Sequence, residues 1–239
     1  MPVSPQDRIF IAIGDVHGHC DRLKSLHDAI FEEASRRHAG MAVTLVHLGD
    51  YVDRGPDSAG AISALMALEA EAEGRGDLSA VSLMGNHERM MIDALEQGGD
   101  AMEHWCLNGG FATRDSYAPH DEALMQAHLD WLKQLPLIHR EADAGLIFVH
   151  AGLHPADHPG ENEQVYLWTR SPRFFDTSWW SAPALDGQRV VHGHTPTTKG
   201  EPEVTPDGRR INIDTGACYG GPLTAVILAP GDQPRFLYA

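Results

Sequence analysis

The chain has little cysteine. Only Cys20, Cys106 and Cys218 occur among its 239 residues. They are odd in number, widely separated, and form none of the close pairs that zinc ribbons and redox motifs require. We therefore expect reduced cysteines with mostly structural roles.

The sequence also lacks long apolar stretches. No segment approaches the roughly 20 consecutive apolar residues that cross a bilayer. The first eight residues lack the basic region and apolar run that mark a signal peptide. These two absences predict a cytoplasmic protein with no membrane partner.

Basic residues are scarce. Against 18 Lys and Arg stand 34 Asp and Glu, so the formal net charge is -16 at pH 7. Such a charge repels DNA, RNA and anionic membranes unless bound metals or a local basic patch reverse the field. We therefore expect no nucleic-acid partner. Histidine, by contrast, is abundant, and several of the 15 histidines stand beside Gly and Asp at the ends of apolar runs.

The first part of the chain alternates strand and helix patterns. Apolar runs at residues 8–14 and 42–48 have the length of buried strands and end in or just before glycine. Between them, Leu23, Leu26 and Ile30 recur at helical spacing. A helix, a strand and the start of another helix follow at residues 58–72, 78–84 and 87–96. This alternation predicts a sheet rich in parallel strands.

The later part of the chain has a different pattern. Residues from about 100 to 140 show helical spacing of large apolar side chains and predict a helical insertion that covers the sheet. Shorter apolar runs, separated by loops rich in Pro and Gly, favour an antiparallel second sheet at residues 146–149, 189–191, 210–213 and 223–228. The predicted fold class is α/β, a β-sandwich of two sheets flanked by helices, in one domain over residues 1–239.

Five polar clusters follow these strand candidates. They are Gly14-Asp15-Val16-His17-Gly18, Gly49-Asp50-Tyr51-Val52-Asp53-Arg54-Gly55, Gly85-Asn86-His87-Glu88, His150-Ala151-Gly152 and Gly193-His194-Thr195. Ligands gather at strand ends in α/β folds, because loops converge there. A single Asp-x-His is more often a turn with a surface histidine, but five clusters in this order indicate a site. Carboxylate, imidazole and amide oxygens without thiolate suit Mn²⁺, Fe or Zn²⁺, and there are enough of them for two ions.

The blocks GDVHG, GDYVDRG and GNHE resemble those of the calcineurin-like metallophosphoesterases, and within them the serine/threonine phosphoprotein phosphatases, especially bacterial and phage members. The resemblance runs from residue 9 to about residue 228. It implies one catalytic domain, built as a β-sandwich with helices outside and holding two divalent metal ions, Mn²⁺ above all, at one edge. The ligands that it implies are Asp15, His17 and Asp50 for one ion, and Asp50, Asn86, His150 and His194 for the other. Asp50 would bridge the two ions.

The same resemblance implies hydrolysis of phosphate esters. Two cations about 3.5–4 Å apart lower the pKa of a water between them, and the resulting hydroxide attacks phosphorus in line. His87, oriented by Asp53, would protonate the leaving oxygen. Arg54 and Arg170 resemble arginines that grip the phosphate as planar forks, although a surface ion pair is the alternative for Arg170. Phosphoproteins or phosphopeptides are the expected substrates.

The chain departs from the superfamily pattern after its last cluster. Some members carry Gly-His-x-His, where the second His is a further ligand, but this chain has Pro196 there. The metal at Asp15 and His17 is therefore expected to have three protein ligands and to need water to complete its shell. His192 precedes His194 by two residues and is expected either to support the ligands from behind or to be structural, because the family's ligand directly follows the glycine.

Two other functions stay open. Symmetrical dinucleoside tetraphosphatases are a sister family with similar metal blocks, but they lack an acidic residue at the position of Asp53 and carry Asp in place of Glu88. Nucleotide-type phosphoesters therefore stand as the alternative substrates. A non-catalytic, metal-binding regulatory scaffold is the second alternative. A scaffold should have lost His87, Asp53 or a ligand, and none is missing.

Overall fold

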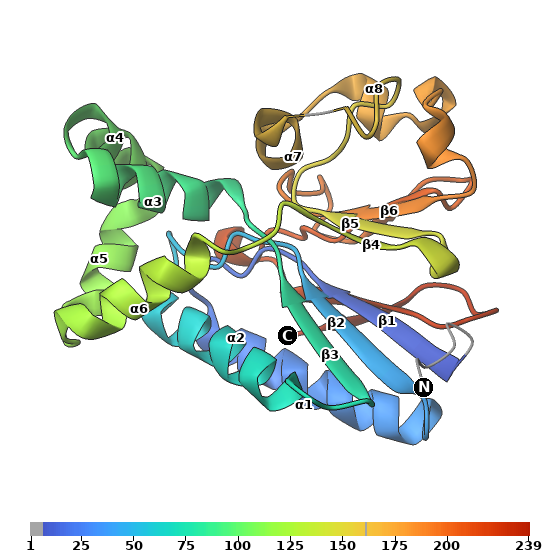
Figure 1. Cartoon of the computed structure of the whole chain (residues 1–239), viewed down its shortest axis with the longest axis horizontal. Coiled ribbons are helices and arrows are strands. Elements are labelled where there is room, and N and C mark those ends of the chain that lie inside the picture. Colours follow the sequence, from blue (N-terminus) through green and yellow to red (C-terminus); the bar gives the residue numbers. More distant parts are fainter. Residues whose placement is uncertain (1–6, 161) are drawn as a thin grey trace.

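Two five-stranded sheets face each other in the computed structural model, which describes residues 7–160 and 162–239 (Figure 1). In order across the first sheet, its strands are β10 (Arg235–Tyr238), β9 (Thr224–Leu228), β1 (Arg8–Ile13), β2 (Ala42–His47) and β3 (Leu78–Ser82). The strands of the second are β4 (Ile138–Glu141), β5 (Leu146–Val149), β6 (Arg189–His192), β8 (Arg210–Asn212) and β7 (Glu203–Val204). The predicted two-sheet sandwich flanked by helices is confirmed.

The first three strands are parallel, as predicted. Helices α1 (Cys20–Arg37) and α2 (Ser58–Ala72) connect them and lie on the outer face of the first sheet (Figure 1). The register pairs Ile13 with His47 and His47 with Ser82, so the three strands end side by side. The loops that carry the first three polar clusters therefore start from the same edge of the sheet.

The prediction of an antiparallel second sheet was wrong. Strands β5, β6 and β8 run parallel, and only the edge strands β4 and β7 are antiparallel to their neighbours. The short helices α7 (Glu163–Trp168) and α8 (Pro172–Phe175) lie in the connection from β5 to β6. Because this connection is mostly loop, its composition resembled that of hairpin turns rather than of a helical crossover.

The run at residues 223–228 was also placed in the wrong sheet. It forms β9, which pairs antiparallel with β1 in the first sheet and sets Ala225 opposite Ile13. All five residues of β9 are buried. A run buried on both faces gives no periodicity that could indicate its partner strand.

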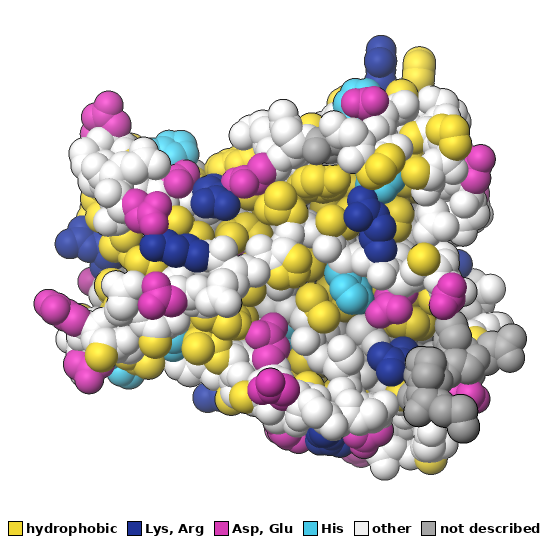
Figure 2. Space-filling model, viewed as in Figure 1, with side chains coloured by type: hydrophobic (Ala, Val, Ile, Leu, Met, Phe, Trp, Pro, Cys, Tyr) yellow, Lys and Arg dark blue, Asp and Glu magenta, His cyan; other side chains and the backbone are white. Residues whose placement is uncertain are grey.

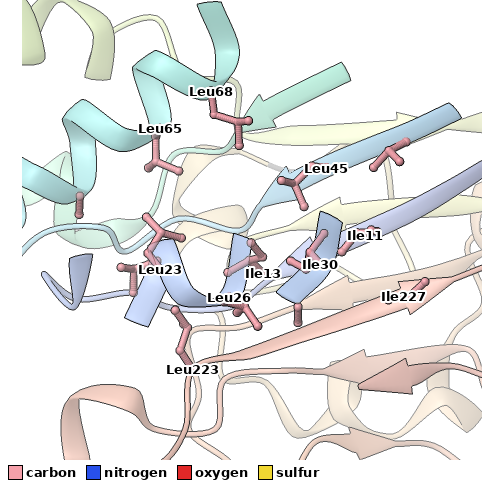
Figure 3. Close-up of a cluster of buried hydrophobic side chains, with 14 of the residues drawn as sticks. Ile11, Ile13, Leu23, Leu26, Ile30, Leu45, Leu65, Leu68, Leu223 and Ile227 are labelled. Atoms are coloured by element: carbon pink, nitrogen blue, oxygen red, sulfur yellow. The ribbon is translucent and has the colours of Figure 1, made fainter. Parts of the chain in front are cut away.

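Alternate residues of β1 enter two different cores. Ile9, Ile11 and Ile13 belong to the core that faces the helices. Figure 3 shows Ile11 and Ile13 on the side of the sheet where Leu23 and Leu26 of α1 lie. Phe10 and Ala12 point the other way, into the layer between the sheets, together with Phe148 and Val191 of the second sheet. The period of two that defines a strand thus produces a layered molecule.

The remaining helices gather at one end of the sandwich, on the left in Figure 1. They are α3 (Asn86–Gln97), α4 (Gly99–Trp105), a turn of π-helix (Cys106–Gly110), α5 (Phe111–Tyr117) and α6 (Glu122–Leu132). Their main packing partners are α2 and α3 rather than a sheet face. The predicted helical stretch also ends too late, because residues 138–141 form β4.

No helix within residues 7–160 and 162–239 is both long and apolar enough to cross a membrane. On the face shown in Figure 2, Lys and Arg side chains occur singly or in small groups, with acidic and uncharged residues between them.

Candidate metal centre

Both sheets contribute loops to one buried cluster of polar side chains. Asp15, Asp50 and Asn86 follow the parallel strands of the first sheet, while His150 and His194 follow β5 and β6 of the second. All five are at most 5 % exposed. Polar groups at this depth need partners, so their contacts indicate what the site can hold.

Asp50 lies at the centre of two groups of metal-ligand atoms. In the first group, its Oδ2 is 3.6 Å from His17 Nε2 and 4.0 Å from His87 Nε2. In the second group, formed with His150 and His194, its Oδ1 is 3.3 Å from His150 Nε2. One carboxylate oxygen therefore faces each group, as a carboxylate shared by two cations requires.

The histidine tautomers fit bound cations. His17 Nδ1 is 2.9 Å from the Val52 carbonyl oxygen and His150 Nδ1 is 2.8 Å from that of Leu48, so both Nδ1 atoms carry the proton. The Nε2 lone pairs then point toward Asp50, which is the arrangement of metal-binding imidazoles.

Asn86 adds an amide oxygen to the second group. Its Oδ1 lies 2.9 Å from His150 Nε2 and 2.8 Å from His194 Nδ1. Because His150 Nε2 carries no proton, two lone pairs face each other there, and a cation would stabilise this contact. His194 Nε2 is buried without a hydrogen-bond partner. These observations show that the donor set fits divalent metal ions.

Asp15 stands at the edge of this arrangement. Its two carboxylate oxygens accept the backbone N–H of His194, each at 3.1 Å. A Cβ on Gly193 would lie 2.1 Å from Asp15 Oδ1, so glycine allows the two loops to meet. The structure thus brings Asp15 against the His194 loop. The two ligand groups around Asp50 do not include it, and its role as a ligand with His17 and Asp50 stays a prediction.

Buried carboxylates crowd the centre. Burial, followed by the nearby charges of Asp214 and Asp50, raises the pKa of Asp15 well above its usual range. Burial and the charge of Glu88 raise the pKa of Asp50 in the same way. Divalent cations would offset this repulsion and favour the ionised carboxylates.

His87 and Asp53 form a buried pair. His87 Nδ1 is 2.7 Å from Asp53 Oδ2, which leaves Nε2 directed toward Asp50. Burial raises the pKa of Asp53 to about 7, against the hydrogen bonds from Thr113 and Trp105 that lower it. Burial, followed by the nearby charge of Arg54, lowers the pKa of His87 to about 3.

The two predicted phosphate-binding arginines lie on opposite sides of the cluster. Arg54 Nη1 is 2.7 Å from His17 Nε2, and its guanidinium lies over the ring of Tyr219. Arg170 reaches the His194 loop, with Nη2 3.2 Å from the His194 carbonyl oxygen and Nη1 3.4 Å from Thr195 Oγ1. Both side chains are partly exposed, so both can approach an anion that enters from solvent.

In the sequence, Glu88 served only to distinguish the phosphatase pattern from the tetraphosphatase pattern. In the structure, Glu88 holds the loop of Asp50 in place. Its Oε2 accepts the backbone N–H of Asp50 at 2.8 Å and of Gly85 at 2.9 Å. Its Oε1 accepts those of Tyr51 at 2.7 Å and Val52 at 3.2 Å. The only signal in the sequence was its place three residues after Gly85, which is typical of a capping Glu at a helix start.

The backbone at the site is strained. Within the described residues, five amino acids other than glycine have a positive φ, and all five belong to the predicted site: His17, Asp50, Asp53, Arg54 and His194. Such conformations are costly for side-chain-bearing residues and concentrate at functional sites. The surrounding hydrogen bonds, including those of Glu88, offset this strain.

Comparison with known proteins agrees with this geometry. The chain is 28% identical over 224 residues to serine/threonine-protein phosphatase 1 of Salmonella typhimurium, covering 89% of this chain and 88% of that protein. It is also 31% identical over 242 residues to the symmetrical bis(5'-nucleosyl)-tetraphosphatase of Paracidovorax citrulli, covering 93% of this chain and 77% of the other.

A solved structure shares the fold. It is a serine/threonine phosphatase from Saccharomyces cerevisiae, with a TM-score of 0.65 at 15% sequence identity, and the superposition covers 98% of this chain and 81% of that one. The family model described as calcineurin-like phosphoesterase matches residues 9–222. The chain therefore belongs to the calcineurin-like phosphoesterase family.

Proposed function

We propose that this phosphoesterase is a serine/threonine protein phosphatase that hydrolyses phosphomonoesters with the help of two divalent cations, Mn²⁺ above all. The observation that carries the proposal is the pairing of His87 with Asp53, 2.7 Å apart and buried beside Asp50. The phosphatase pattern has an acidic residue at the position of Asp53, whereas the symmetrical tetraphosphatase pattern does not.

In the proposal, Asp15, His17 and Asp50 hold one cation, and Asp50, Asn86, His150 and His194 hold the other. The two oxygens of Asp50 and the fixed tautomers of His17 and His150 support these roles. For Asp15, the support is its place after β1 and the nearby charge of Asp50, which contributes to its raised pKa. When bound, such cations supply Lewis acidity, which lowers the pKa of water and neutralises phosphate charge.

Arg54 and Arg170 bind the phosphate in this proposal. A guanidinium offers two parallel N–H donors to one phosphate, and the exposed position of each arginine leaves these donors free to turn toward a substrate. Arg54 would exchange its contact with His17 for one with the phosphate. Once they bind the phosphate, the two guanidinium groups would orient the ester for in-line displacement.

His87 acts as the general acid in the proposal. The Asp53 carboxylate at Nδ1 stabilises the imidazolium, and Nε2 on the far side of the ring faces the reaction centre. Nε2 gives its proton to the departing oxygen of the serine or threonine side chain, which would otherwise leave as an unstable alkoxide.

We also propose one catalytic domain for residues 1–239, in which the helical segment from α4 to α6 is an insertion. Its packing on α2 and α3, next to the site, supports this view.

The proposal is tested by an assay with Mn²⁺ that compares a phosphoserine peptide with a symmetrical dinucleoside tetraphosphate. We expect kcat/KM to be higher for the peptide. A clear preference for the dinucleoside would favour the second candidate, symmetrical tetraphosphatase activity. The similarity to the Paracidovorax citrulli protein supports this candidate. If the protein hydrolyses neither substrate, the third candidate, a non-catalytic metal-binding scaffold, would be favoured.

A further inference from the structure

The Asp53 carboxylate is held by side chains from the helical segment as well as by His87. Its Oδ1 accepts hydrogen bonds from Thr113 Oγ1 at 2.7 Å and from Trp105 Nε1 at 2.9 Å. Its Oδ2 is 2.7 Å from His87 Nδ1 and 3.0 Å from the same Trp105 nitrogen. Asp53, Trp105 and Thr113 have no exposed surface. Water therefore cannot replace either donor.

Thr113 is itself fixed in one orientation. Its single hydroxyl proton points to Asp53 Oδ1, and its oxygen accepts the backbone N–H of Asp53 at 2.8 Å. Since that proton is used, Ser58 Oγ must be the donor in the 2.9 Å contact between the two hydroxyls. Both the backbone and the carboxylate of Asp53 are thus tied to α5.

Trp105 is fixed by packing. Its indole ring lies against Gly110 so closely that a Cβ at Gly110 would be 2.6 Å from the ring. The ring also belongs to the apolar core formed with Met90, Tyr117 and Leu132. The indole N–H has no freedom to leave Asp53, because the ring cannot rotate in this core.

We infer that Trp105 and Thr113 are positioning residues for the general acid: they orient the Asp53 carboxylate so that Oδ2 accepts from His87 Nδ1 and His87 Nε2 faces the substrate. The inference rests on the proposed function, in which His87 protonates the leaving oxygen. A carboxylate without these donors would be buried with an unsatisfied oxygen, and it would turn or draw a proton to regain a partner. Either change would misalign His87.

Trp105→Phe and Thr113→Val test the inference, because each removes a donor to Asp53. Val keeps the shape of Thr, while Phe keeps an aromatic ring at position 105 but is smaller than Trp. We expect kcat on a phosphoserine peptide to fall by about tenfold or more, since part of the contribution of the general acid is lost. The loss of kcat on an aryl phosphate should stay below about threefold, because its leaving group needs little protonation. KM and bound Mn²⁺ should not change. Thr113→Ser, which keeps the hydroxyl, should restore activity on the peptide.

Trp131→Phe is the matched control. Trp131 lies in α6 of the same helical segment, and its indole N–H donates to another carboxylate, Glu69 Oε2 in α2, at 2.8 Å. Trp131→Phe should leave kcat on the phosphoserine peptide and on the aryl phosphate unchanged. A readout independent of catalysis is the proton NMR signal of the Trp105 indole N–H, identified by its absence in Trp105→Phe. This signal should move upfield in Asp53→Asn, because an amide is a weaker acceptor than a carboxylate.

The outcomes separate the inference from the proposed function. His87→Asn should itself lose more activity on the peptide than on the aryl phosphate. Suppose that it does, but that Trp105→Phe and Thr113→Val match the wild type or lose activity equally on both substrates. The positioning role of Trp105 and Thr113 would then be wrong, while the general-acid role of His87 would be supported. If His87→Asn shows equal losses on the two substrates, the general acid and its positioning are both wrong.

Discussion

Glu88 shows how one side chain can fix a loop of the candidate metal centre. Its carboxylate accepts four backbone N–H groups, three of them from consecutive residues that begin with Asp50. Asp50 has a φ of 56°, a conformation that residues other than Gly, Asn and Asp seldom adopt. A loop in that shape needs partners for its N–H groups, and the single carboxyl group of Glu88 supplies them.

Glu88→Gln should therefore destabilise the protein by about 2–3 kcal/mol, because the amide NH₂ would face the N–H groups of Asp50 and Gly85. Chemical denaturation measures the change. The exposed Glu103→Gln in α4 is the control and should have little effect. A Glu88→Gln protein as stable as the wild type would mean that the loop does not depend on this carboxylate.

The arginines can be tested by a change that keeps their charge. Arg54→Lys and Arg170→Lys should each lower kcat/KM on a phosphomonoester by about tenfold or more, since Lys offers a point charge in place of a planar fork. Metal analysis should find unchanged Mn²⁺ content. Arg173→Lys, whose guanidinium lies over Trp179 away from the centre, is the control. Unchanged kinetics for Arg170→Lys would show that its role lies outside phosphate binding.

At the scale of elements, α1 is tied to β2 by a pair of histidines. His27 Nε2 is 2.9 Å from His47 Nε2, and His47 is fully buried. Burial lowers the pKa of His27 to about 4, and burial together with His27 lowers the pKa of His47 well below its usual range. Both rings are therefore neutral at pH 7.

This pair should make the fold sensitive to acid. Because the folded pKa of His27 lies below the unfolded value of about 6.5, its contribution is complete above pH 6.5 and is lost as the pH falls toward 4. The free energy of unfolding of the wild type should fall between pH 7 and pH 5. In His27→Gln, this fall should be smaller by about 2 kcal/mol. Urea denaturation at both pH values measures this, with the exposed His104→Gln as control. Equal losses in wild type and His27→Gln would show that the pair does not titrate as described.

The elements also show what the sequence could predict. The parallel strands β1 to β3 and the polar clusters after them followed from local patterns: apolar runs of strand length, helical spacing between them, and glycines where strands end. The pairing of β9 with β1 could not be predicted in this way, because it depends on contacts between residues more than 200 positions apart in the sequence. Local sequence patterns do not predict such long-range contacts.

Within the candidate site, the sequence indicated which polar residues gather there, but not which residues hold them in place. Trp105 and Thr113 looked like ordinary members of amphipathic helices, because a sequence shows which helical face is apolar but not which carboxylate an indole N–H will meet. The strained backbone of His17 and Asp50 was equally hidden, since neither is a residue that marks such a conformation as glycine does.

At the scale of the whole molecule, the centre exists only where the two sheets meet. Asp50 and Asn86 come from the first sheet, while His150 and His194 come from the second, and the core around Phe10, Phe148 and Val191 holds the sheets together. The formal charge of -16 includes the buried carboxylates of this centre. Binding of cations is therefore expected to stabilise the whole sandwich, since they bind the folded chain alone.

The most direct test is metal analysis of the wild type and of Asp50→Asn after dialysis against Mn²⁺. Among the residues that the structure describes, Asp50 alone belongs to both ligand groups, with one oxygen facing each, and a neutral amide cannot balance two dications. The wild type should bind two ions per chain, and Asp50→Asn should lose bound metal and phosphatase activity together. Asp50→Asn protein that keeps two ions and near-normal turnover would contradict the bridged two-metal centre.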